Sequence, residues 1–120
     1  MNQKINYPKS KYYRSPKLLK LVTELSCQNC ESTPTQAAHS NWHGGKGRGI
    51  KASDEYIAAL CQTCHHDIDA GNKLTKAQRR ELWERAHIRT LHVLLLHNQW
   101  PKEIPLTDIY LRMEGNGASF

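Results

Sequence analysis

The chain has 120 residues, of which 38% are hydrophobic, so it is long enough for one small domain with a limited apolar core. It opens without the apolar run of a signal peptide, and its most apolar stretch, LHVLLLHNQW, is too short to cross a membrane. A membrane or secreted protein is therefore not expected, and a cytoplasmic location is. Of the net charge of +6, all the excess lies before Glu24: six basic and no acidic residues precede it, and eleven of each follow from there.

Residues 1–23 are expected to form a basic N-terminal arm and the start of a first helix. Lys11 and Arg14 lie among tyrosines, a mixture that suits phosphate contacts and stacking on bases or sugars. A solvated tail is the alternative interpretation. Ser15 and Pro16 then predict a helix start, followed by the helical stretch KLLKLVTEL, because proline is tolerated in a first turn.

Residues 24–75 are expected to form the core of the domain. A CQNC turn leads to a short strand, TQAAH, and then to HGGKGRG, whose glycines predict a loop. Ser53 is a candidate cap for a short helix over SDEYIAAL. After CQTC, a short helix is predicted from His65 to a stop at Gly71.

Residues 76–120 are expected to form a long helix and a tail that packs on the core. Thr75 and Gln78 fit a capping box before a helix over residues 76–98. The tail IPLTDIYLRM is predicted to add a strand or to pack across the core. The apolar residues 91–96 suggest a buried helix end or a subunit contact. Trp83 and Trp100 are expected in the core rather than stacked on bases. Three further histidines are expected at the surface or boundary rather than in a ligand set: His87, His92 and His97.

Two CxxC pairs, separated by thirty residues, predict a structural zinc site. Each two-residue spacing lets a tight turn aim both sulfurs at one ion, and two such turns complete a closed tetrahedral site. Redox-active pairs are disfavoured because no βαβ pattern surrounds them, and disulfides because a cytoplasmic chain keeps its thiols reduced. The proposed zinc ligands are Cys27, Cys30, Cys61 and Cys64.

A second group of polar residues follows the last cysteine. His65 and Asp69 are four residues apart, so a helix places both on one face within reach of a common ion. Nitrogen and carboxylate ligands suit a catalytic divalent cation, with magnesium, manganese and zinc all left open. His39 follows the apolar strand, and histidine can take a proton from water. His43 and His66 are weaker candidates, for which a surface position is the main alternative.

The order of these motifs resembles the HNH (ββα-metal) endonucleases in their zinc-knuckle form. The matching segments are CQNC, QAAHS, HGGKGRG and ALCQTCHHDID, together with Lys51 and Asp54. Among these enzymes the chain looks most like the prophage YbcO-type nucleases, and it is also similar to the nuclease domain of the RecA-dependent nuclease Ref. The resemblance covers about Ser26 to Gly71 well and the following helix loosely.

The resemblance implies a role for each matching residue. His39 corresponds to the general base, and His65 and Asp69 to ligands of the catalytic metal. Asp54 is a candidate for orienting the base, with Tyr56 closer to the usual offset. Ala38 stands where many relatives have a metal ligand, so His39 as a ligand, with His43 or a water as base, stays open. The candidate nucleic-acid contacts are Lys11, Arg14, Lys46, Arg48 and Lys51.

These observations predict an α+β protein: a small zinc-stapled ββα-metal domain with a long C-terminal helix. The expected function is metal-dependent cleavage of DNA in a phage or prophage recombination or repair setting. A non-catalytic zinc-stabilised nucleic-acid-binding module and an adaptor for a recombination protein are the alternatives. A homodimer through the apolar end of the long helix is also open.

Overall fold

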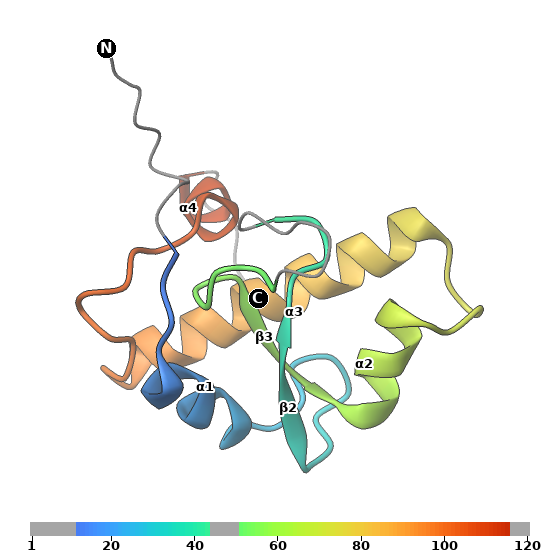
Figure 1. Ribbon diagram of the computed structural model, residues 1–120, viewed down its shortest axis with the longest axis horizontal. Coiled ribbons are helices and arrows are strands. Elements are labelled where there is room, and N and C mark those ends of the chain that lie inside the picture. Colours follow the sequence, from blue (N-terminus) through green and yellow to red (C-terminus); the bar gives the residue numbers. More distant parts are fainter. Residues whose placement is uncertain (1–11, 44–50, 116–120) are drawn as a thin grey trace.

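The computed structural model describes residues 12–43 and 51–115, with side chains through Arg112. This part of the chain has an α+β fold in which a two-stranded sheet lies among helices (Figure 1). The elements in chain order are α1 (Pro16–Thr23), β2 (Thr35–His39), β3 (Ile57–Cys61), α2 (Gln62–Asp69), α3 (Lys76–Leu96) and α4 (Asp108–Gly115).

The sheet pairs β2 antiparallel to β3, with Thr35 opposite Cys61 and His39 opposite Ile57. All five residues of β3 are buried, because α3 packs on this strand while α1 packs on β2. The helix predicted over SDEYIAAL is therefore wrong, and its second half is β3. A short run of apolar residues shows neither the helical nor the strand periodicity of polar positions. Whether it forms a helix or a strand therefore depends on the elements that pack against it.

The first helix begins as predicted. The Ser15 hydroxyl accepts a hydrogen bond from the backbone N–H of Leu18 at 3.1 Å, and Pro16 occupies the first turn. The helix ends at Thr23, two residues before the end of the predicted segment. Its Leu18 and Val22 are buried in the hydrophobic core.

The long helix α3 is confirmed, with both bonds of the predicted capping box between Thr75 and Gln78 present. Trp83 and Trp100 lie in the core as expected. His87 does not lie at the surface or boundary: it is completely buried. Its Nδ1 lies 2.7 Å from the Ile57 carbonyl oxygen and its Nε2 lies 2.7 Å from the Thr107 hydroxyl. Burial lowers the pKa of His87 to about 4, so the ring is neutral and ties β3 to the tail.

The tail packs on the core, which is the second of the two predicted alternatives, and it does so as a helix and not as an added strand. Ile109 and Tyr110 of α4 are buried with Ile104. The Tyr56 hydroxyl donates a hydrogen bond to Asp108 Oδ1 at 2.8 Å, which fixes the start of α4 beside β3. Within the described residues, no helix combines the length and the apolar character needed to span a membrane.

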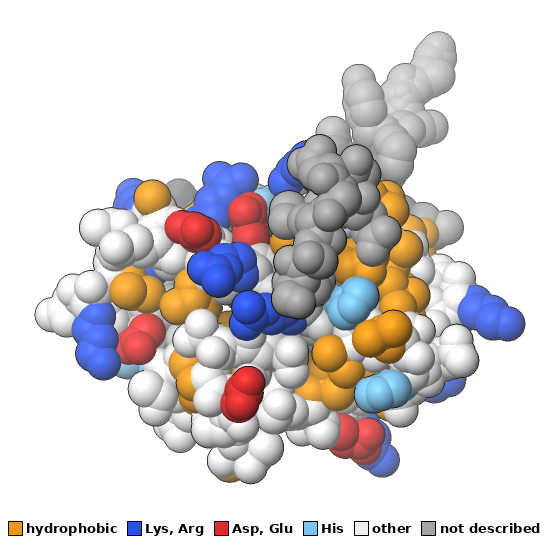
Figure 2. All heavy atoms as spheres, turned by 180° about the vertical axis from the view of Figure 1, so that it is seen from behind, with side chains coloured by type: hydrophobic (Ala, Val, Ile, Leu, Met, Phe, Trp, Pro, Cys, Tyr) orange, Lys and Arg blue, Asp and Glu red, His pale blue; other side chains and the backbone are white. Residues whose placement is uncertain are grey.

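The surface on the far side of the molecule from Figure 1 mixes both signs of charge. Figure 2 shows Lys and Arg side chains lying next to Asp and Glu on this face, with hydrophobic side chains between them. The mixture matches the balance of eleven basic and eleven acidic residues from Glu24 onward. The excess of positive charge therefore belongs to residues 1–23, of which 1–11 lie outside the described part of the chain.

Candidate metal centre and histidine site

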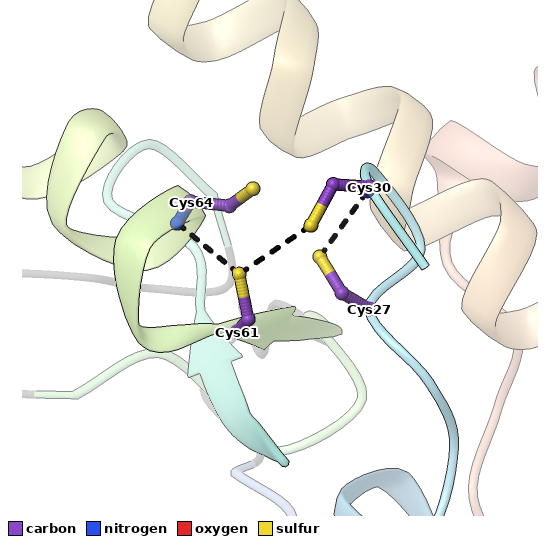
Figure 3. A group of neighbouring side chains, drawn as sticks. All are labelled: Cys27, Cys30, Cys61 and Cys64. Atoms are coloured by element: carbon purple, nitrogen blue, oxygen red, sulfur yellow. Dashed lines mark hydrogen bonds between the residues drawn. The ribbon is translucent and has the colours of Figure 1, made fainter. Parts of the chain in front are cut away.

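The two cysteine pairs meet at one point of the fold. Cys27 and Cys30 come from the turn after α1, while Cys61 ends β3 and Cys64 lies in the first turn of α2. Their sulfur atoms face one another (Figure 3), and all four lie within 4.8 Å of each other. The Sγ atoms of Cys30 and Cys61 are 3.6 Å apart. Four sulfurs bound tetrahedrally to zinc at about 2.3 Å would be separated by about 3.8 Å, so the cluster fits one such ion.

Local hydrogen bonds hold these sulfurs in place. The backbone N–H groups of Asn29 and Cys30 point at Cys27 Sγ, at 3.4 and 3.5 Å, and the Cys64 N–H points at Cys61 Sγ at 3.5 Å. The pKa of the Cys61 thiol is lowered to about 6, mainly by a hydrogen bond from the Ser32 hydroxyl. Burial raises the pKa of the Cys64 thiol to about 12. Holding Cys64 as a thiolate therefore calls for a compensating cation, which a structural metal such as zinc would supply.

The predicted pair on α2 is in direct contact. His65 Nε2 lies 3.0 Å from Asp69 Oδ2, one helical turn away. Two neighbouring ligand atoms on an octahedral ion, each bound at about 2.1 Å, are about 3 Å apart. The pair therefore has the spacing of two adjacent ligands. In residues 12–43 and 51–112, the cysteines alone form a cluster of three or more His, Cys, Asp or Glu ligand atoms.

Two amide side chains contact the pair from the direction of β2. Gln36 Oε1 lies 2.7 Å from His65 Nδ1, and Asn41 Nδ2 donates to Asp69 Oδ1 at 2.7 Å. The sequence interpretation missed both residues. Neither has a motif that singles it out, and the pairing of β2 with β3 and α2 is what brings them to the site.

His39 is held by a buried carboxylate. Its Nε2 lies 2.8 Å from Asp54 Oδ1, and only 3% of Asp54 is exposed. The same carboxylate accepts hydrogen bonds from the backbone N–H of Ser15 at 2.7 Å and from Arg14 at 3.4 Å. Because the carboxylate is an acceptor, Nε2 carries the proton and Nδ1 keeps the lone pair. Of the two candidates for orienting His39, Asp54 makes the contact, whereas the Tyr56 hydroxyl binds α4.

His43 packs at the edge of the core, and both of its ring nitrogens contact other side chains. Its Nδ1 lies 2.9 Å from the Ser40 hydroxyl and its Nε2 lies 3.0 Å from Glu84 Oε2. The ring stacks on Tyr56 and Trp83, with centroid distances of 6.0 and 5.7 Å. Burial lowers the pKa of His43, which favours the neutral ring. Both ring nitrogens of His43 are therefore engaged in contacts within the protein.

Alternation along β2 separates the histidine contacts. Gln36 and Ala38 lie on one face of the strand, and Ala37 and His39 on the other. Asn41, two residues after His39, bonds to Asp69. The His65–Asp69 pair therefore contacts the second residue of β2 and the turn that follows the strand, whereas Asp54 contacts His39 at the end of the strand.

The predicted nucleic-acid contacts are only partly covered by the structure. Lys11, Lys46 and Arg48 lie outside the described residues. Lys51 is exposed, as is His66. Arg14 is about half exposed and donates hydrogen bonds to the carbonyl oxygens of Tyr13 and Ala52, at 3.1 and 2.9 Å.

Fold and site together define a small α+β protein with a four-cysteine site suited to a structural metal such as zinc. A family model described as "Protein of unknown function (DUF968)" matches residues 2–96, so the chain belongs to this family. No curated protein and no solved structure matches the chain.

Proposed function

We propose that the protein is a metal-dependent DNA endonuclease of the HNH (ββα-metal) type. The observation that carries the proposal is the order β2–β3–α2. An antiparallel pair of strands leads directly into a helix, His39 ends the first strand, and the helix carries the His65–Asp69 pair. The cysteine cluster ties the turn before β2 to the junction of β3 and α2 and would hold the structural zinc.

The side chains divide the chemistry between them. Asp54 fixes the Nε2 proton of His39, so Nδ1 takes a proton from water as the water oxygen attacks phosphorus and the bond to the leaving oxygen breaks. His65 and Asp69 would hold magnesium, manganese or zinc. When bound, such an ion neutralises charge on the scissile phosphate and the leaving oxygen.

The substrate in this proposal is DNA, bound through its phosphates. The candidate contacts Lys11, Arg14, Lys46, Arg48 and Lys51 supply positive charge, and neutralised phosphates release counterions. The proposed setting is phage or prophage recombination or repair. A recombination-protein partner or a second copy would meet the end of α3, where Leu96 is 66% exposed.

A non-catalytic nucleic-acid-binding module is the second candidate. It is favoured by Ala38, which offers no ligand where the resemblance expects one. Two pockets that share Gln28, Asn29 and Arg89 lie between the first cysteine turn and α3. They offer amide and guanidinium groups to such a ligand, although Glu31 lines one pocket and Glu81 the other.

The experiment that tests the proposal uses zinc-loaded protein with single-stranded, duplex and branched DNA in magnesium or manganese. His39→Ala and His65→Ala are each expected to lower the cleavage rate by about 10²-fold or more while zinc content and folding stay unchanged. His97→Ala is the matched control, because this exposed histidine lies at the end of α3 and is not a candidate site residue. Binding to every substrate without cleavage, unchanged by either variant, would instead support the binding module.

A further inference from the structure

The His65 ring has an acceptor opposite each of its nitrogens. Gln36 Oε1 lies 2.7 Å from Nδ1, and Asp69 Oδ2 lies 3.0 Å from Nε2. A neutral imidazole carries one proton and can donate to one acceptor. With the amide oxygen of Gln36 facing Nδ1, the contact at Nε2 then holds either a second ring proton or a cation bound by Nε2 and the carboxylate.

We infer that Gln36 is a positioning residue that fixes the Nδ1–H tautomer of His65 and turns Nε2 toward a divalent cation shared with Asp69. This inference rests on the proposed metal role of the pair. Histidine ligands commonly donate their second N–H to an oxygen, which sets both the tautomer and the ring orientation. Gln36 supplies that oxygen from β2, and its position in a paired strand gives it a fixed direction.

The carboxylate is held in a matching way. Asn41 Nδ2 donates to Asp69 Oδ1 at 2.7 Å, which leaves Oδ2 as the oxygen facing His65. One amide therefore binds each member of the pair on the side away from the 3.0 Å gap. Gln36 also lies on the same face of β2 as Ala38, where the resemblance expects a metal ligand. Here that face offers an amide that contacts the histidine ligand instead.

The test is Mn²⁺ binding to zinc-loaded protein, followed by the electron paramagnetic resonance signal of free Mn²⁺. Gln36→Leu removes the acceptor and is expected to weaken Mn²⁺ binding by about 10-fold or more, the range typical of such supporting residues. Gln36→Glu restores an oxygen acceptor and is expected to bind at least as tightly as the wild type. Gln62→Leu is the matched control, because Gln62 is an exposed glutamine on α2.

A second readout reports the tautomer itself. ¹⁵N spectra of the histidine rings, recorded with Mg²⁺ present, are expected to show His65 protonated at Nδ1 in the wild type. Gln36→Leu is expected to lose that preference, and Gln36→Glu to keep it. A wild-type His65 protonated at Nε2 with Mg²⁺ present would overturn the inference, because Nε2 would then not be a ligand.

The outcomes separate this inference from the proposed function. Mn²⁺ binding that disappears in His65→Ala but is unchanged in Gln36→Leu would overturn the role of Gln36 and leave the metal role of His65 standing. Wild-type protein without His65-dependent Mn²⁺ binding would overturn both. Weaker binding in Gln36→Leu, with full binding in Gln36→Glu and Gln62→Leu, would support both.

Discussion

The two polar sites that meet at α2 differ in how their donor atoms are held. The four-cysteine cluster uses two short turns, and within each turn backbone N–H groups of the same few residues point at the sulfurs. The histidine site needs side chains from separate segments: His65 and Asp69 from α2, Gln36 from β2 and Asn41 from the turn that follows. A closed site can be specified locally, whereas the open one depends on the fold around it.

The largest effect is expected from removing one ligand of the cysteine cluster. Cys64→Ser removes one proposed zinc ligand that is buried in the core. Because zinc binding and folding are coupled, with metal affinities worth about 10–16 kcal/mol in zinc-finger peptides, we expect loss of zinc and of cooperative thermal unfolding. Metal analysis and circular dichroism measure both. Wild-type unfolding in a zinc-free variant would show that the cluster does not support the fold.

The histidine site should respond without loss of the fold. In the proposed enzyme, His39→Ala is expected to lower the cleavage rate by about 10²–10⁴-fold, the usual contribution of a general base. Asp54→Asn should lower it comparably, because its single amide oxygen cannot accept from both His39 Nε2 and the Ser15 backbone N–H, and its NH2 group then faces one of these donors. Single-turnover rates on the cleaved substrate measure both effects. Equal rates for wild type and His39→Ala, with zinc retained, would remove His39 from the chemistry.

The same contrast between local and distant determinants explains what the sequence could predict. Cysteine spacing and the capping residues Ser15 and Thr75 act within a few positions, and the elements they predict are present. The strand Ile57–Cys61 was mistaken for a helix because its burial comes from β2 and α3, not from its own pattern. His87 was placed at the surface or boundary for the same reason: its partners, Ile57 and Thr107, are thirty and twenty residues away.

The contacts of His87 with residues far away in the sequence can be tested through the pH dependence of stability. Burial lowers its pKa to about 4 in the folded protein, against about 6.5 when unfolded, so the unfolded chain binds the extra proton between these values. Its contribution to stability is therefore complete above about pH 6.5 and falls, by on the order of 3 kcal/mol, as the pH drops toward 4.

The measurement compares urea unfolding of the wild type and His87→Gln, both zinc-loaded, across this pH range. The variant should be less stable at neutral pH by about 2 kcal/mol, because the glutamine amide does not satisfy both the Ile57 carbonyl and the Thr107 hydroxyl. The gap should narrow and then reverse as the pH falls toward 4, since the variant has no group that titrates at this position. A gap that stays constant would show that His87 is not held neutral by burial.

The smallest effect is expected at the N-cap of α3, a feature that residues close in sequence determine. Thr75→Ala removes the hydroxyl that accepts from the Gln78 backbone N–H at 3.1 Å at the start of α3. Loss of such a cap typically lowers stability by about 1 kcal/mol, or about 4 °C in melting temperature for a chain of this size. Thr63→Ala, at an exposed position inside α2, is the matched control and should not lower it. If both variants melt like the wild type, the packing of Trp83, Leu91 and Leu94 holds α3 without its cap, and even this locally encoded helix start depends on the fold around it.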